Sequence, residues 1–182
     1  MKFISAELPG IVVVEPNVFG DSRGFFMETW NKREFERNGI ATNFVQDNHS
    51  RSVQGTLRGF HYQHKQAQGK LVRAISGEIF DVVVDIRKSS DTFGKSYSLV
   101  LSEENKKMLW VPVGFAHGFY VLSKTAEIVY KASDYYAPEH EQTIKWDDPE
   151  LAIGWPLVDG KPPILSTKDS SGAAFKAAKY FD

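Results

Sequence analysis

A succession of short segments rich in β-branched and aromatic residues most constrains how this chain of 182 residues can fold. Turn formers such as Ser76-Gly77 and Pro112-Val113-Gly114 separate these segments. We predict strands at Ile11–Val14, Leu71–Ile75, Glu78–Ile86, Tyr97–Leu101, Lys107–Val111, Gly118–Val121 and Glu127–Ala132. Strands that follow one another so closely, with little helix between them, favour an antiparallel sandwich or barrel. We expect one all-β domain over residues 1–182.

Two short peripheral helices are also expected. The first is Asn31–Asn38, where Asn31 can cap the N-terminus and Gly39 can end the helix. The second is Ala173–Tyr180, near the end of the chain.

The composition excludes several classes of function. The 22 Lys and Arg residues nearly balance the 23 Asp and Glu residues, so the net charge of −1 predicts neither a nucleic-acid partner nor a membrane partner. The absence of cysteine excludes disulfides and thiolate metal sites. The apolar run Ile11–Val14 is too short for a signal peptide or a membrane span. A cytoplasmic protein is therefore expected.

The segment Gly55–Gln63 carries the most informative chemistry, because it places Arg58 and His61 three residues apart. A neutral imidazole, with a pKa of about 6.5, is a good general base at physiological pH. Further basic residues fall on nearby predicted strands, namely Lys70, Arg73 and His117. Cations gathered on one face favour an anionic ligand. The alternative for His61 is a partly buried strand histidine that bonds a neighbour.

A base histidine works better when a carboxylate fixes its tautomer. Asp169, in a small polar segment near the end of the chain, is the first candidate, although it could instead cap the helix at Ala173. Asp81 and Asp85 are rival partners on the apolar segment Ile79–Ile86.

Two tyrosines are candidates for contact with a substrate. Tyr130, on a late strand, can donate a proton to a carbanionic carbon if it is held opposite the base, or it can be a core aromatic. Tyr136, which follows a turn, can stack on a flat ring or pack on its own strand.

The segment Pro112–Gly118 has the pattern Pro-x-Gly-x-x-His and resembles the second motif of the cupins, a family of small β-barrels. In cupins this histidine completes a metal site begun by His-x-His and a Glu. Here Gln63 stands at the second histidine, and Lys70 at the Glu. A protonated lysine has no lone pair for a metal. We therefore expect a cupin-type jelly-roll barrel, or double-stranded β-helix, without a metal.

A cavity holding His61, Lys70 and Tyr130 suits proton chemistry next to a carbonyl. His61 can remove a proton from carbon, Lys70 can stabilise the enolate oxygen, and Tyr130 can return a proton from the opposite face. The outcome is epimerisation. It needs no cofactor, and the chain has no Gly-rich dinucleotide fingerprint.

With these residues in view, nearly the whole chain resembles the dTDP-4-dehydrorhamnose 3,5-epimerase family. The matching segments, in order, are Asp21–Glu28, Gln46–Ser50, Gly55–Gln63, Gly94, Leu101–Asn105, Trp110–Gly118, Trp146–Pro149 and Ser166–Asp169.

The resemblance implies a role for each matched residue. His61 would be the proton acceptor paired with Asp169, Tyr130 the proton donor, and Lys70 the neighbour of the keto oxygen. Tyr136 and Phe19 would stack on thymine. The residues lining the rest of the substrate would be Arg23, Glu28, Gln46, Asp47, Asn48, Arg58, His117, Glu141 and Lys168. It also implies a homodimer in which N-terminal strands cross to the neighbouring subunit and share its site.

The substrate implied is a dTDP-linked 4-keto-6-deoxyhexose, inverted at C3 and C5 in dTDP-L-rhamnose biosynthesis. Three alternatives stay open at this point. They are an epimerase of one centre acting on a related dTDP-4-keto sugar, a metal-dependent cupin, and a binding barrel without catalysis.

Overall fold

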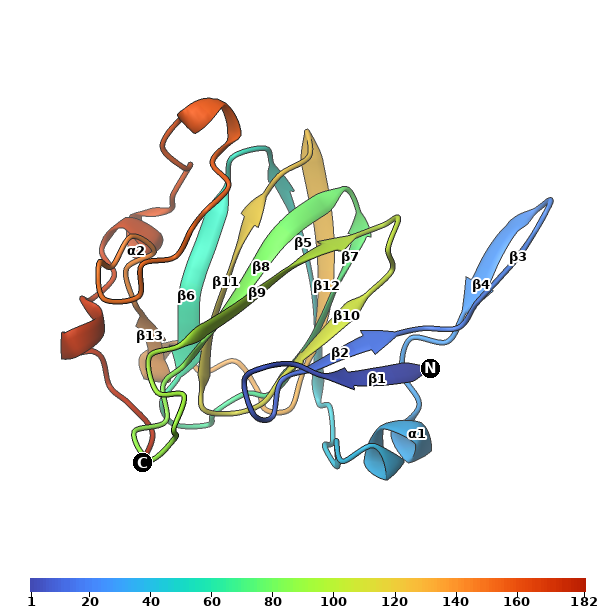
Figure 1. Ribbon diagram of the computed structural model, residues 1–182, viewed down its shortest axis with the longest axis horizontal. Helices are drawn as coiled ribbons and strands as arrows, with labels where there is room; N and C mark the ends of the chain where they lie inside the picture. Colours follow the sequence, from blue (N-terminus) through green and yellow to red (C-terminus); the bar gives the residue numbers. More distant parts are fainter.

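Two antiparallel sheets lie face to face in the computed structural model, which describes residues 1–182 (Figure 1). The first has the order β1 (Lys2–Ser5), β2 (Val12–Glu15), β10 (Met108–Val111), β7 (Lys70–Ser76), β12 (Thr125–Ala132) and β5 (Gln46–Val53). The second has the order β13 (Glu141–Thr143), β6 (Leu57–Gln63), β11 (Phe115–Val121), β8 (Glu78–Asp85) and β9 (Ser96–Ser102). The prediction of an all-β jelly roll is confirmed.

The main core fills the space between the two sheets. Because side chains alternate along a strand, Val72 and Ala74 of β7 point inward together, and they meet Val83 of β8 and Phe119 of β11. The core ends toward the edge β5, where the inward positions become polar, as at Asn48. That change in side chains leaves room for a cavity.

Each sheet is also covered on its outer face. Helix α1 (Lys32–Arg37) places Phe35 against Leu71 and Trp110 of the six-stranded sheet. Burial of a side chain of this size contributes about 1.5–3 kcal/mol. The other sheet is covered by the C-terminal part of the chain, including Leu151 and Phe175 (Figure 1).

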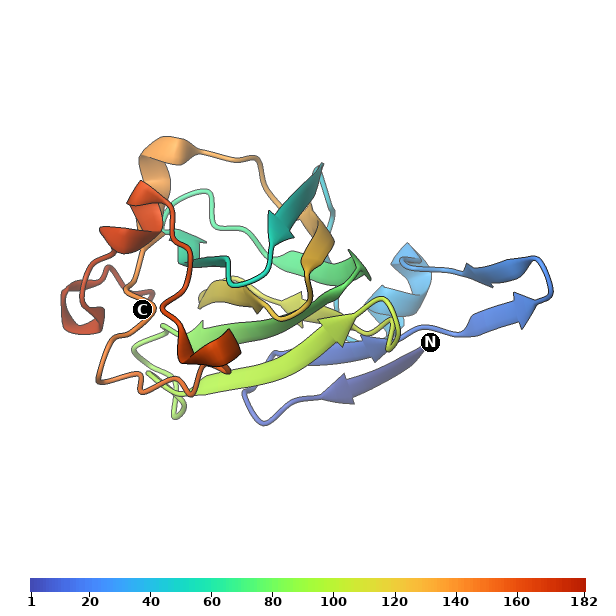
Figure 2. The ribbon, with the colours of Figure 1, turned by 90° about the horizontal axis from the view of Figure 1, so that it is seen from above.

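The hairpin of β3 (Val18–Asp21) and β4 (Gly24–Met27) projects away from the barrel (Figures 1 and 2). Its aromatic side chains Phe19, Phe25 and Phe26 are 60–70% exposed. An isolated two-stranded hairpin is only marginally stable in water. Exposed aromatic rings on such an element indicate a surface that binds another molecule.

One of the two predicted helices is confirmed. Helix α1 begins after Asn31, whose side chain accepts a hydrogen bond from the Glu34 amide, and the chain turns away at Gly39 with φ of +83°. The helix predicted at Ala173–Tyr180 is wrong, because only Phe175–Ala177 forms a single 3₁₀ turn. Bridges from Ala173 to Ile144 and from Phe181 to Arg87 hold the chain extended on either side.

A short helix that the sequence did not indicate, α2 (Thr167–Ser170), precedes that turn and lies against β6. Single 3₁₀ turns also occur at Pro138–His140 and Val158–Gly160. None of the helices is long and apolar enough to span a bilayer.

Candidate active site

A cavity of about 370 Å³ opens between the sheets at the end nearest β5. Its walls come from β5, β7 and β12 of one sheet, from β6, β11 and β13 of the other, and from α2. Ten of the residues selected from the sequence line it, namely Gln46, Asn48, Arg58, His61, Lys70, His117, Tyr130, Tyr136, Glu141 and Lys168. The fold therefore brings into one cavity residues that lie more than a hundred positions apart.

His61 is bonded to Asp169, whose side chain is 3% exposed. The His61 Nε2 atom lies 2.6 Å from Asp169 Oδ1, and the Gly59 amide donates to the same oxygen at 3.1 Å. Ser166 Oγ donates to the other oxygen at 2.6 Å. Although burial alone would raise the pKa of Asp169, the hydrogen bonds from His61 and Ser166 lower it to about 2. The carboxylate is thus ionised and accepts from Nε2–H.

The imidazole of His61 is consequently set up as a base. Burial lowers its pKa below the ordinary value of 6.5, and this outweighs the hydrogen bond to Asp169, which raises the pKa. The ring is neutral at pH 7. With the proton on Nε2, the lone pair is on Nδ1.

Asp81 and Asp85, the other two predicted partners of His61, bond different groups, and Asp169 is not the helix cap that it could have been. Asp81 bonds His117, and Asp85 bonds Arg87, so neither reaches His61. Asp169 does not cap a helix, since Ser166 is the cap of α2 and accepts from the Asp169 amide. The spacing Ser-x-x-Asp is a capping-box pattern, which is the sequence signal that could have located α2.

Tyr130 enters the cavity from the sheet opposite His61. It lies on β12, where its neighbours are Asn48 of β5 and Val72 of β7. Burial, assisted by the negative charge of Glu141, raises the pKa of the Tyr130 phenol. The phenol therefore keeps its proton at neutral pH and can donate it.

Lys70 supplies a cation to the same cavity. Its ammonium lies 5.9 Å from the centroid of the Tyr130 ring. Burial lowers the pKa of Lys70 to about 8, while the charges of Glu141 and Asp81 oppose that shift. Lys70 is mostly protonated at pH 7, and a buried ammonium can stabilise a developing oxyanion strongly.

Polar groups surround the mouth of the cavity. Lys168 Nζ donates to Glu141 Oε1 at 2.9 Å, and the Tyr136 hydroxyl donates to Glu141 Oε2 at 3.0 Å. The Asn48 Oδ1 atom accepts from Gln46, but its Nδ2 is buried without a protein partner. Such an unpartnered donor favours a ligand that carries an acceptor there.

Gln63, which stands where a cupin has a metal ligand, is used for structure instead. Its Nε2 donates to the carbonyls of Gln66 and Tyr135, and its Oε1 accepts from the Ala137 amide. No group of three or more His, Cys, Asp or Glu side chains is arranged to hold a metal. The donor set at this position therefore does not fit a cupin metal.

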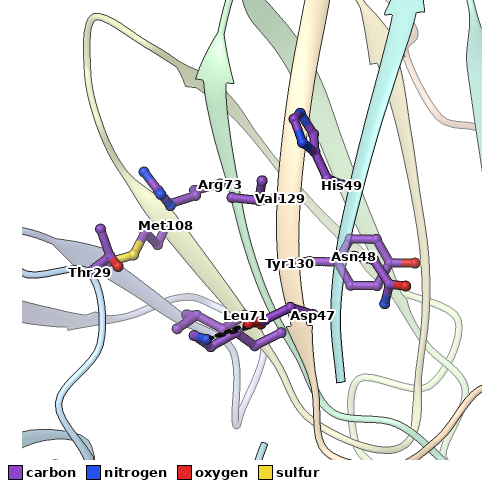
Figure 3. A pocket seen from close by; sticks show the side chains of 10 residues that line it. Thr29, Asp47, Asn48, His49, Leu71, Arg73, Met108, Val129 and Tyr130 are labelled. Atoms are coloured by element: carbon purple, nitrogen blue, oxygen red, sulfur yellow. Dashed lines mark hydrogen bonds and ion pairs between the residues drawn. The ribbon is translucent and has the colours of Figure 1, made fainter. Parts of the chain in front are cut away.

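Asp47 and Arg73 lie on the outer face of the six-stranded sheet. They line a second cavity, of about 310 Å³, that shares Asn48, His49 and Tyr130 with the first (Figure 3). Because residues alternate along β5, Asp47 points away from Asn48 and forms an ion pair of 2.9 Å with Lys131. The same alternation on β7 separates Arg73 from Lys70, so the expectation that Arg73 shares one face with the other basic residues is wrong.

The remaining predicted residues lie outside both cavities within one chain. Phe19 and Arg23 are on the projecting hairpin, where Arg23 pairs with Asp21 at 2.6 Å. Glu28 accepts a hydrogen bond from Asn31. A single subunit does not bring these three residues to His61.

Comparisons with known proteins point to one family over nearly the whole chain. The family model described as dTDP-4-dehydrorhamnose 3,5-epimerase matches residues 5–177. The dTDP-4-dehydrorhamnose 3,5-epimerase of Pseudomonas aeruginosa is 57% identical over 182 residues, which cover 100% of this chain and 99% of that protein. The corresponding protein of Shigella flexneri is 54% identical over 183 residues, with coverage of 100% and 99%.

A solved structure is also close in shape. The dTDP-6-deoxy-D-glucose-3,5-epimerase of Legionella pneumophila, solved in complex with dTDP-4-keto-L-rhamnose, superimposes with a TM-score of 0.94. The two chains are 49% identical, and the match covers 98% of this chain and 94% of that one. With the family model, the full-length relatives and the shared fold in agreement, this chain belongs to the dTDP-4-dehydrorhamnose 3,5-epimerase family.

Proposed function

We propose that this protein is an isomerase that converts dTDP-4-dehydro-6-deoxy-D-glucose into dTDP-4-dehydro-L-rhamnose for dTDP-L-rhamnose biosynthesis. The observation that carries the proposal is the placement of His61 and Tyr130 on opposite sheets of one cavity. One is a neutral imidazole and the other a protonated phenol. That is the pair of protonation states that a proton transfer across a sugar ring requires.

Each inversion proceeds by two proton transfers. His61 Nδ1 removes the proton from a carbon next to the C4 ketone, and the electron pair of that C–H bond moves onto the C4 oxygen. The Lys70 ammonium stabilises this enolate. The Tyr130 hydroxyl then protonates the same carbon from the opposite face. His61 is left as the imidazolium and Tyr130 as the phenolate, and exchange with solvent restores both.

Both C3 and C5 flank the C4 ketone, so the same base and acid can act at either carbon. Every step is a proton transfer, and neither a redox group nor a metal is needed to balance it. General acid–base catalysis by a positioned side chain typically contributes 10²- to 10⁴-fold per group, about 3–5 kcal/mol.

The dTDP part of the substrate lies at the cavity mouth in this proposal. Arg58 and Lys168 face the diphosphate, because guanidinium and ammonium groups bind phosphate oxygens. Tyr136, which is 53% exposed, stacks on thymine. Gln46, Asn48 and Glu141 provide the hydrogen bonds that position the nucleotide and sugar, and His117 contacts the sugar.

We further propose a homodimer in which each hairpin completes the partner's site. Phe19, Arg23 and Glu28 do not reach the cavity of their own chain, and the hairpin that carries the first two is exposed. The outer face near Asp47 and Arg73 is hollow and half apolar, which suits contact with a second subunit. The single domain of residues 1–182 and a cytoplasmic location remain part of the proposal.

Product stereochemistry tests the proposed reaction. The purified protein is incubated with dTDP-4-dehydro-6-deoxy-D-glucose and a reductase that traps the 4-keto product, and the sugar is identified by NMR. We expect dTDP-L-rhamnose. Recovery of a sugar inverted at only one carbon would instead support the single-centre alternative, and recovery of unchanged configuration would reject catalysis.

A further inference from the structure

Asp81, on β8, is fully buried and has no part in the reaction derived above. Both of its carboxylate oxygens lie 2.9 Å from Nε2 of His117, and this is its hydrogen-bonding partner. Burying a carboxylate costs free energy unless it is paired. The burial of Asp81 in the middle of an apolar strand therefore suggests that this carboxylate has a function that offsets the cost.

Strand register explains why Asp81 meets His117. His117 of β11 is directly opposite Val83 of β8, and Asp81 is two residues away along the same face. On its other side His117 is directly opposite His61 of β6. Two imidazole–carboxylate pairs thus stand next to each other, with the carboxylates supplied by different elements, β8 and α2.

The pair orients His117 toward the cavity. A carboxylate accepts hydrogen bonds, so Nε2 carries the proton and Nδ1 is the nitrogen left for other contacts. His117 lines the same cavity as Lys70. Without a partner on Nε2, the ring could take either tautomer and present a donor or an acceptor to the substrate.

We propose that Asp81 is a positioning residue of the epimerase: it holds His117 in the Nε2–H tautomer and places a buried negative charge behind His117, in the wall of the cavity that Lys70 also lines. The inference rests on the proposed function, because it concerns the groups placed around the C4 oxygen. Asp81 itself does not contact the substrate.

The charges around Lys70 define what Asp81 contributes. The basic or cationic groups that line the cavity with it are His49, Arg58, His61, His117 and Lys168. The acidic or phenolic groups are Asp81 behind His117, together with Tyr130, Tyr136 and Glu141. Burial lowers the pKa of Lys70 to about 8, and Glu141 and Asp81 are the two charges that raise it against that effect.

Asp81→Asn removes the negative charge while keeping the shape of the side chain. In this variant Lys70 loses its proton at a lower pH, so the alkaline limb of kcat should move down by at least about half a pH unit. A shift of half a unit from a pKa of about 8 lowers the protonated fraction of Lys70 at pH 8 from about one half to about one quarter, so this effect alone should reduce kcat there about twofold. KM should change much less, because Asp81 does not contact the substrate.

Asp85→Asn is a matched control on the same strand. Asp85 is equally buried, but it bonds Arg87, Ser90 and Thr92 and lies outside the cavity. This variant should lower the melting temperature and leave the pH profile of kcat at its wild-type position. A shift of the alkaline limb in Asp81→Asn alone supports the proposal, while an equal profile in both variants overturns it.

A measurement on the unmodified protein keeps the test independent of folding of the variant. The ¹⁵N shifts of His117 report its tautomer, and we expect Nε2–H at pH 7. Finding Nδ1–H in the wild type overturns the proposal even if Asp81→Asn does not fold. If the wild type gives no epimerisation, the proposed function fails. If the wild type is active and Asp81→Asn has the same pH profile as the wild type, only the role of Asp81 fails.

Discussion

His61 and His117 are directly opposite each other on β6 and β11, and the Nε2 of each imidazole is bonded to a different buried carboxylate. Strands β6 and β11 can approach closely here because Gly59 of β6 packs against Gly118 of β11, next to the two histidines. A Cβ atom on Gly59 would lie 2.5 Å from the Gly118 Cα, so no larger residue fits. The same glycine directs its amide to Asp169. Backbone packing thus fixes the base and its carboxylate together.

The base and the acid should fail in different ways when each is removed. His61→Asn should reduce turnover by about 10⁴-fold, the upper end of what a general base contributes, and abolish exchange of sugar protons with solvent. Tyr130→Phe should retain exchange, because His61 still removes the proton, while completed inversion is impaired. NMR in deuterated water measures both effects. Near-full activity in both variants would contradict a mechanism that uses two faces of the sugar.

Replacing the carboxylate behind His61 should be nearly as harmful as replacing the base. In Asp169→Asn the acceptor for Nε2–H is weakened, so the ring can move its proton to Nδ1 and lose the basic nitrogen. We expect kcat to fall about 10³-fold or more. Ser166→Ala is the matched control, since it removes one hydrogen bond to the carboxylate and the cap of α2 but keeps the carboxylate, and it should cost much less. Steady-state kinetics that rank the two variants in the reverse order would exclude a role for Asp169 in setting the tautomer.

The pH dependence of kcat/KM should be bell-shaped. His61 must be neutral, and because burial lowers its pKa below 6.5, activity should persist below that pH and decline only on further acidification. Lys70 must be protonated, and its pKa of about 8 places the alkaline decline there. Initial rates between about pH 5 and 10 check this, as profiles of kcat/KM report the free enzyme. A flat profile above pH 8 would show that the charge on Lys70 is not required.

Mixing two inactive variants can test whether sites are shared between subunits. One variant carries Phe19→Ala and Arg23→Ala in the hairpin, and the other carries His61→Asn in the barrel. In a mixed dimer, the intact hairpin of the second completes the intact barrel of the first. Random exchange of subunits should then give about one complete site in four. Activity that stays at the level of the separate variants would mean that each chain uses its own hairpin.

The cluster around Asp85 should contribute to stability and not to catalysis. Asp85 accepts hydrogen bonds from Arg87, Ser90 and Thr92, which hold the loop after β8. Breaking a buried ion pair costs about 3–5 kcal/mol, so Asp85→Asn should lower the free energy of unfolding by about that amount. Lys161→Ala, which breaks an exposed pair with Asp159, should cost less than about 1 kcal/mol. Urea unfolding of both variants measures the difference.

The sequence was sufficient to predict the barrel strands whose residues are buried on one or both faces. Leu71–Ile75 and Glu127–Ala132, for example, correspond to β7 and β12. It did not indicate the strand β5, because Gln46–Val53 is almost entirely polar and its alternate residues line a cavity or the outer face. Hydrophobic periodicity cannot detect a strand whose two faces are both polar.

Part of the active site could also be predicted from the sequence. His61 and Lys70 stood out because a base or a cation in a β-rich segment needs a function, whereas Tyr130 was singled out as the proton donor by the resemblance to the family. The hydrogen bond from the Gly59 amide to Asp169 could not be predicted, since it joins α2 to a backbone amide more than a hundred residues away. Asp81 was considered only as a partner for His61, because strand register, which places it beside His117, is not visible in the sequence.

Counting deuterium in the product tests the central claim most directly. The wild-type protein is incubated with dTDP-4-dehydro-6-deoxy-D-glucose in deuterated water, the product is trapped by reduction, and the deuterium at each sugar carbon is measured by NMR. An imidazole that removes protons and a phenol that replaces them from solvent predict incorporation at both C3 and C5, with inversion at each. Inversion without deuterium at those carbons, or no inversion at all, would contradict the account.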